Sequence, residues 1–168
     1  MDCVRVLVDG NNLTYALRDV GPEGAGRSML CRLLGEFAAR TKLAVAVVFD
    51  GPAPAGDLAR QIADARIAVY YSGHRSADEV LAELIAAHSA PRSLTVISTD
   101  HDVRRHARHR RCHVVTSADF AARLVAPAPP KREPAEPPEK RTGLDEGETQ
   151  EWLKEFGLTD SSQDQQEG

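Results

Sequence analysis

Short apolar runs recur along residues 1–126, and segments with helical spacing of their apolar residues lie between them. Five runs have the length and the β-branched content of buried strands, namely residues 4–8, 45–49, 67–71, 94–98 and 112–116. Strands that are apolar on both faces are typical of parallel sheets covered by helices. The alternation therefore predicts an α/β fold, with a doubly wound, mostly parallel sheet of about five strands flanked by helices.

Six helices are predicted between and after these strands, at residues 13–18, 27–41, 57–65, 76–88, 102–110 and 117–125. In the second of them, five apolar residues at helical spacing predict one buried stripe: Met29, Leu30, Leu33, Leu34 and Phe37. Ser76 and Glu79 form a capping-box pattern at the start of the fourth helix, and Ser117 is expected to cap the last one.

The composition changes after residue 126. Residues 1–126 hold 16 basic and 14 acidic residues, whereas residues 127–168 hold 5 basic and 11 acidic ones. The first part is predicted to be one domain. Residues 127–147, rich in Pro, Glu and Lys, are predicted to be a disordered linker, because they cannot bury enough apolar surface to offset their ordering entropy.

A short apolar cluster interrupts the acidic tail. Trp152 and Phe156 lie four residues apart, so residues 148–158 predict a short amphipathic helix, followed by a disordered tail at residues 159–168. Packing on its own domain and docking on a protein partner both remain open for this helix, and we favour docking slightly.

Cysteine content and hydropathy limit the class of protein. Three widely spaced cysteines without a CxxC pair argue against a disulfide framework or a zinc ribbon and suit a reducing cytosol. The N-terminus leads directly into a predicted strand, so no signal peptide is expected. No apolar stretch approaches the ~20 residues of a membrane span. We expect a soluble, cytoplasmic protein that does not bind membranes.

Acidic residues follow the predicted strands at positions that a parallel sheet brings together. Asp9, Asp50 and Asp100 follow the first, second and fourth strands, and Asp78 opens the helix after the third. Ligands of open parallel sheets bind beyond the carboxyl ends of the strands, and gathered carboxylates supply the oxygen ligands that Mg²⁺ prefers. The pattern predicts a metal-dependent enzyme that acts on phosphates.

Local context separates the roles of these acids. Asp78 heads the apolar stripe of its helix, so we favour it as a ligand and expect its neighbour Glu79 to be mainly structural. Asp50 lies in an Asp-Gly-Pro turn, and a supporting role is as plausible as a plain turn. Asp102 is either a further ligand or the N-cap of the next helix, whereas Asp100 is not expected to act as a cap.

Residues 101–113 combine five arginines and four histidines with a single acid. If this segment is helical, four arginines are predicted to cover its outside: Arg104, Arg105, Arg108 and Arg111. Such a patch beside an acidic site suits a polyanion, whose phosphates give sequence-independent affinity, although an ordinary solvated helix face is the alternative. A zinc site is disfavoured because no standard ligand spacing occurs among His101, His106, His109 and Cys112.

Four short motifs occur in a fixed order, at residues 8–13 (VDGNNL), 48–51 (VFDG), 76–79 (SADE) and 97–100 (ISTD). In these motifs the chain resembles a NYN domain, a type of PIN-like nuclease, and is most similar to the YacP-like branch over roughly residues 3–125. The resemblance implies a PIN-like sheet, an acidic cluster that binds Mg²⁺ or Mn²⁺, and cleavage of RNA. Asn11 departs from the pattern, since an aromatic residue is frequent there.

The resemblance also implies roles for individual residues. The acids matching the family's metal-binding core are Asp9, Asp78 and Asp100. Asn12 matches a catalytic asparagine that would orient a phosphate or water, and Asp102 falls near a less regular fourth metal ligand. The residues implied to support the site are Asp50, Glu79, Ser98 and Thr99. Arg75 and the arginines of the Arg104–Arg111 helix would hold the RNA backbone.

The implied function is a metal-dependent endoribonuclease that hydrolyses RNA phosphodiester bonds. Whether its RNA is mRNA on the ribosome is left open. Two other functions are considered. A Toprim-like phosphotransfer domain expects a glutamate where Asp9 stands, and a non-catalytic RNA-binding or adaptor module gains nothing from acids that repel phosphate.

Overall fold

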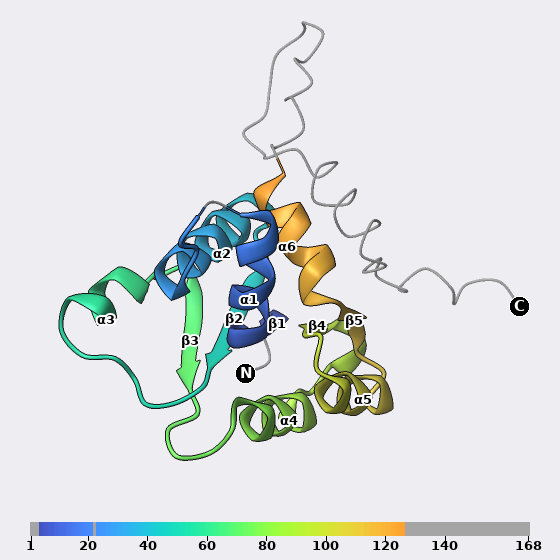
Figure 1. The fold of residues 1–168 in the computed structure, drawn as a ribbon. Helices are drawn as coiled ribbons and strands as arrows, with labels where there is room; N and C mark the ends of the chain where they lie inside the picture. The colour runs from blue at the N-terminus through green and yellow to red at the C-terminus, as the bar shows by residue number, and fades with distance from the viewer. Residues whose placement is uncertain (1–3, 22, 127–168) are drawn as a thin grey trace, which may run out of the picture.

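The computed structural model describes residues 4–21 and 23–126. Its core is a five-stranded sheet in which every neighbouring pair of strands is parallel, in the order β3-β2-β1-β4-β5 (Figure 1). The strands are β1 (Val4–Asp9), β2 (Ala44–Phe49), β3 (Ile67–Tyr71), β4 (Thr95–Ile97) and β5 (His113–Val115). The predicted α/β class and the parallel five-stranded sheet are confirmed.

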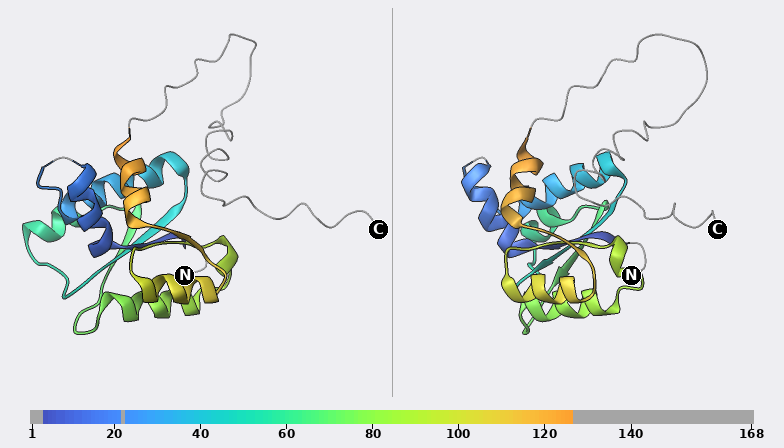
Figure 2. Two further views of the ribbon diagram at one scale, coloured as in Figure 1. Left: turned by 45° about the vertical axis from the view of Figure 1, so that its right-hand side comes forward. Right: turned by 90° about the vertical axis from the view of Figure 1, so that its right-hand side faces the viewer.

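Helices cover both faces of this sheet (Figure 2). They are α1 (Gly10–Val20), α2 (Arg27–Thr41), α3 (Asp57–Ile62), α4 (Ala77–Ala87), α5 (His101–His109) and α6 (Ser117–Val125). Helices α1, α2 and α6 pack on the face to which Val6 and Val8 point, whereas α4 and α5 pack on the face of Leu7. Because both faces are buried, the central strands β1 and β2 are nearly continuous apolar runs.

Several predicted boundaries and caps need correction. Helix α1 begins at Gly10 rather than at residue 13, because Asp9 caps it by accepting a hydrogen bond from the Asn12 backbone N–H. Thr116, not Ser117, caps α6, and Ser117 is its buried first residue. In α2, Met29 and Leu33 of the predicted stripe are only half-buried. A short 3₁₀ turn, Pro91–Ser93, precedes β4.

The structure bears on the expectation about membrane spans but not on those about residues 127–168. No helix in residues 4–21 and 23–126 is long and apolar enough to span a membrane. The predicted linker at 127–147, the helix at 148–158 and the tail at 159–168 lie outside the described residues.

Candidate functional site

The order in which strands are added to the sheet reverses between β1 and β4, although all the strands remain parallel. From β1 the chain adds β2 and then β3 on one side, and it then returns to place β4 and β5 on the other side. In such sheets the helices that follow the two central strands lie on opposite faces, which opens a crevice beyond their carboxyl ends. Asp9 ends β1, and Ser98 and Asp100 follow β4, so this crevice is bordered by three of the predicted site residues.

Asp9, Asn12 and Ser98 form one hydrogen-bonded network in this crevice. Asp9 is only 2% exposed, and its Oδ1 accepts the backbone N–H of Asn12 at 3.0 Å. Its Oδ2 accepts the Asn12 side-chain amide and, at 3.0 Å, the Ser98 hydroxyl. Hydrogen bonds to the charged form compensate a buried carboxylate for the hydration that it loses. The network therefore fixes Asp9 in one orientation.

Ser98 also links Asp9 to Asp100. The Asp100 backbone N–H donates to the Ser98 hydroxyl oxygen at 3.0 Å. The Asp100 side chain is the N-cap of α5, because its Oδ1 accepts from the backbone N–H groups of Asp102 at 2.8 Å and Val103 at 3.0 Å. The expectation that Asp100 has no capping role is therefore wrong, and Asp102 lies in the first turn of the helix instead. Within the described chain, no hydrogen bond reaches Oδ2 of Asp100.

Asp78 lies in the first turn of α4, which packs on the same face of the sheet as α5. Partial burial of its carboxyl group raises its pKa, and the negative charges of four further acids raise it in addition: Asp100, Asp9, Asp50 and Asp102. Carboxylates that follow or border four different strands thus act on one another electrostatically. This concentration of negative charge is the chief property of the site.

The donor set at this edge fits a hard divalent cation, because it consists of carboxylate, amide and hydroxyl oxygens. No three His, Cys, Asp or Glu side chains among residues 4–21 and 23–126 are arranged to enclose an ion by themselves. Mg²⁺ usually keeps several water ligands and binds through one or two carboxylates together with substrate phosphate. An open arrangement of acids is compatible with that mode of binding.

We predict that Asp78→Asn stabilises the metal-free protein at neutral pH. Because folding raises the pKa of Asp78, the folded chain holds this proton more tightly than the unfolded chain. The stability that depends on Asp78 therefore falls as the pH rises through the folded-state pKa. The gain should be at most about 1 kcal/mol, since the residue is exposed and screened. Urea unfolding in EDTA at pH 7 and at pH 3 measures it, and the gain should vanish at pH 3.

Asp57→Asn is the matched control for this prediction. Asp57 is also exposed in the first turn of a helix, but its partner is Arg60 rather than other acids. The control should be neutral or slightly destabilising, because the helix dipole favours an acid at that position. The prediction would be contradicted if Asp78→Asn, like the control, were neutral or destabilising at pH 7.

Asp50 joins the end of β2 to the start of α4. Its Oδ1 accepts the Ala77 backbone N–H at 2.7 Å and the Ser72 hydroxyl at 3.3 Å, and its Oδ2 accepts the Asn11 amide at 3.0 Å. Ala77 is the first residue of α4, so this carboxylate satisfies a helix donor that has no intrahelical partner. The contacts thereby hold the helix that carries Asp78.

Two other predicted supporting residues also hold helix starts. Ser76 and Glu79 form the predicted capping box, in which the Glu79 backbone donates to the Ser76 hydroxyl at 3.2 Å and the Ser76 backbone donates to the Glu79 carboxylate at 3.1 Å. The Thr99 hydroxyl accepts the Ser117 backbone N–H at 3.2 Å at the start of α6. The capping box stabilises the start of α4, and the bond from Ser117 to Thr99 attaches the start of α6 to the segment that follows β4.

The predicted basic residues occupy different environments. Arg75 makes a two-pronged ion pair with Glu83, which raises the pKa of Arg75 and lowers that of Glu83. Arg105 pairs with Asp102 at 3.1 Å. Arg108 and Arg111 are exposed as expected, but Arg104 is half-buried because it lies on the flank of α5, and it does not cover the outside.

Arg110 has a structural role that the sequence pattern does not indicate. Its guanidinium donates to the backbone oxygens of Ala86 and His88, each at 3.0 Å, and so holds the C-terminal end of α4 against α5. The four residues of the zinc alternative are not brought together as ligands in the described chain, and Cys112 is buried.

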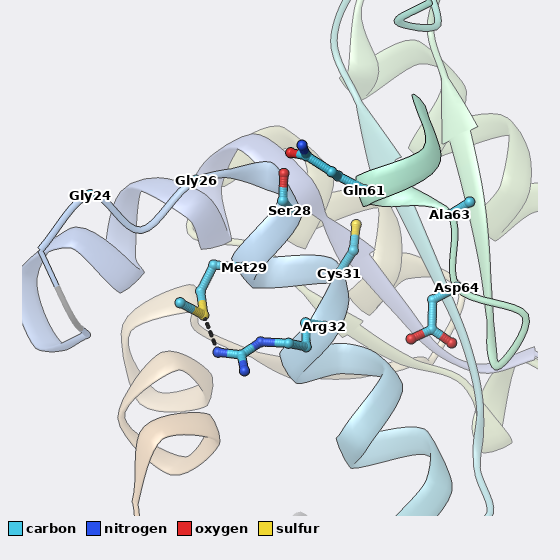
Figure 3. Close-up of a pocket in the computed structure, with 9 residues that line it drawn as sticks. All are labelled: Gly24, Gly26, Ser28, Met29, Cys31, Arg32, Gln61, Ala63 and Asp64. Carbon is cyan, nitrogen blue, oxygen red and sulfur yellow. Dashed lines mark hydrogen bonds between the residues drawn. The ribbon is translucent and has the colours of Figure 1, made fainter. Parts of the chain in front are cut away.

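A separate pocket of about 530 Å³ lies between α2 and α3 (Figure 3). Ser28, Cys31, Gln61 and Asp64 line it, and none of the predicted acids does. Burial, helped by the negative charge of Asp64, raises the pKa of Cys31 to about 11. The thiol is therefore protonated at neutral pH and is not an activated nucleophile.

Comparisons with known proteins give one family and one fold. The family model described as "YacP-like NYN domain" matches residues 6–156. The match extends well beyond residue 125, so the expectation that Trp152 lies outside the resemblance is wrong. A comparison with curated proteins gives no match.

The solved structures that share the fold include two of Rae1 (YacP) from Bacillus subtilis. One aligns with a TM-score of 0.57 at 21% identity, over 71% of this chain and 72% of that chain. A point mutant of the same protein aligns with a TM-score of 0.54 at 20% identity, over 71% of this chain and 73% of that chain. At this level of identity the likeness establishes the fold alone.

Proposed function

Because the chain belongs to the YacP-like NYN domain family, a family of PIN-like nucleases, we propose that it is a metal-dependent endoribonuclease that hydrolyses RNA phosphodiester bonds in the cytoplasm. The observation that carries the proposal is the placement of Asp9 and Asp100 on the two sides of the β1–β4 crevice, joined by Ser98. At the start of α4, Asp78 lies near enough to Asp100 and Asp9 for their negative charges to raise its pKa.

Each residue of the site has a task in this proposal. Asp9, Asp78 and Asp100 would hold Mg²⁺ or Mn²⁺, with Asp102 as a further candidate, and a bound ion would polarise the phosphate and lower the pKa of water. Ser98 keeps two of these acids at a fixed separation. Asn12 donates its amide to Asp9 and lies at the crevice, where the same amide group can orient a phosphate oxygen or a water molecule.

The two alternative functions fare differently. Membership of the NYN family excludes the Toprim-like domain. The adaptor alternative is disfavoured by the acids themselves, since mutual repulsion among Asp78, Asp100 and Asp9 costs stability and repels RNA unless a cation neutralises it. A site that binds a cation gives these charges a use.

Cleavage of labelled RNA tests the proposal directly. The purified full chain should cut single-stranded or structured RNA internally in Mg²⁺ or Mn²⁺, and the reaction should stop in EDTA and resume when the metal is restored. Cleavage that is unaffected by EDTA would argue against a metal site. Metal-dependent stabilisation in a thermal melt, without any cleavage, would instead favour a binding module.

We further predict that exposed arginines of the α5 region contribute to RNA affinity. Replacing Arg105, Arg108 and Arg111 with Gln should weaken binding and make its salt dependence less steep, by about 0.7 in the logarithmic slope for each phosphate that the variant no longer neutralises. Arg104 is left unchanged because it is half-buried. Fluorescence anisotropy in EDTA at several salt concentrations measures the slope.

The control for this prediction replaces Arg18 and Arg92 with Gln. Both are exposed, Arg18 in the last turn of α1 and Arg92 just before β4, at the edge of the sheet away from the acids. Equal slopes in the α5 variant and the wild type would show that the α5 arginines form only a solvated helix face.

A further inference from the structure

Arg27 is fixed at the end of β2 by two contacts. It is the first residue of α2, and its guanidinium lies 5.1 Å from the centroid of the Phe49 ring. Its Nη2 also donates to the backbone oxygen of Asp50 at 3.1 Å. A guanidinium has five N–H donors in a planar fork, so these contacts orient the group without exhausting its hydrogen-bonding capacity.

The residues that hold Arg27 contact the segments that carry Asp9 and Asp78. Phe49 is fully buried, and its ring packs so closely on Gly10 that no side chain fits there. Gly10 directly follows Asp9, which is paired across the sheet with Val48. The Asp50 side chain binds Asn11 and the first backbone N–H of α4. The Arg27 cation therefore lies at the β2 side of the crevice edge.

Arg27 has no carboxylate partner in the described chain, in contrast to Arg75 and Arg105. Arg75 pairs with Glu83, and Arg105 pairs with Asp102. Within residues 4–21 and 23–126, Arg27 makes no ion pair, and its contact with Asp50 goes to the backbone oxygen. Its charge is thus available to an anion at the edge of a site that otherwise repels anions.

We propose that Arg27 binds a backbone phosphate of the RNA substrate beside the phosphate that is cleaved, on the β2 side of the site. This inference rests on the proposed nuclease function. A guanidinium matches two phosphate oxygens with two N–H groups, and preorganisation by Phe49 and Asp50 lowers the entropic cost of binding. The contact fixes the register of the strand over the acids and is independent of base sequence.

Two substitutions distinguish a role of Arg27 in phosphate binding from a role in packing on the Phe49 ring. Arg27→Met keeps an apolar stem over the ring but removes the charge, whereas Arg27→Lys keeps a charge. Arg92→Met is the matched control, because it removes an exposed arginine from the opposite edge of the sheet. Each full-length variant is tested for its melting temperature, for affinity to a single-stranded RNA oligonucleotide in EDTA, and for cleavage in Mg²⁺.

Arg27→Met should weaken RNA binding about tenfold and make the salt slope less steep by about 0.7, with a matching rise in KM for cleavage. Arg27→Lys should stay within about threefold of the wild type, and Arg92→Met should be unchanged. If the wild type cleaves RNA but Arg27→Met and Arg92→Met have equal RNA affinity and equal salt slope, the role of Arg27 is overturned and the proposed nuclease function is not. A wild type that neither binds nor cleaves RNA would overturn the proposed function as well.

Discussion

Asp100→Asn should reduce metal-dependent RNA cleavage by about 100-fold or more while leaving the melting temperature within a few degrees of the wild type. Asn caps helices as well as Asp does, so its side-chain oxygen can still accept the backbone N–H groups of Asp102 and Val103 at the start of α5. What the substitution removes is the charge. Removal of a metal ligand costs several kcal/mol of transition-state stabilisation, which corresponds to this decrease in rate.

Asp9→Asn should abolish cleavage equally but with a larger effect on stability. Asp9 is buried and accepts hydrogen bonds from Asn12 and Ser98 through both carboxylate oxygens. An amide has only one acceptor oxygen, so one of these donors would face an NH₂ group. Asp100 is therefore the cleaner test of the metal site.

Single-turnover cleavage rates with Mg²⁺ in excess, together with thermal melts, measure both effects. Asp19→Asn serves as the control, because Asp19 is exposed near the far end of α1. Full activity in both Asp9→Asn and Asp100→Asn would rule out these residues as metal ligands. Asp102→Asn, measured alongside, decides whether that residue belongs with them, since it is exposed and already paired with Arg105.

Gly10→Ala should destabilise the protein by about 3 kcal/mol and lower its melting temperature by roughly 10 °C or more. An added Cβ would lie 2.5 Å from two atoms of the Phe49 ring and 2.8 Å from the Val48 backbone oxygen. The ring is fully buried and stacked against Tyr71, and the backbone of β2 is held by its pairing with β1. Neither neighbour can move without disturbing the core, and the strain falls next to Asp9.

Gly26→Ala is the control for the steric argument. Gly26 has a negative φ, and the nearest atom to an added Cβ is 3.8 Å away, so this substitution should change stability by less than about 1 kcal/mol. Denaturant unfolding of both variants measures the difference. If Gly10→Ala unfolded at the same denaturant concentration as Gly26→Ala, close packing would not be the reason for glycine at this position.

Local sequence patterns determined the elements of this fold. The apolar runs of β1 and β2 indicated strands buried on both faces, and therefore a parallel sheet between two layers of helices. The apolar spacing of residues 27–41 and the Ser76–Glu79 capping box located α2 and the start of α4. These features are encoded within one or two helical turns or one strand, so they can be read without knowledge of the rest of the chain.

The acidic residues of the candidate site could also be proposed from the sequence, because each follows a strand whose end could be located. Their mutual arrangement could not be derived from local pattern. Only the strand order places β4 beside β1, so that Ser98 bonds Asp9 from 89 positions further along the chain. The sequence could not show whether Asp100 or Asp102 caps α5, because two acids two residues apart fit the start of a helix equally well. The structure shows that the helix begins at His101, so Asp100 is the cap.

Contacts between distant segments decided the remaining features. Gly10 is the first residue of α1, and the close approach of the Phe49 ring of β2 requires a glycine there. Arg27 carried no signal in the sequence and became a candidate only when α2 placed it over the same ring. Local pattern fixes secondary structure because backbone hydrogen bonding and hydrophobic periodicity are short-range. The site depends on which strand ends become neighbours, and packing of the whole chain sets that.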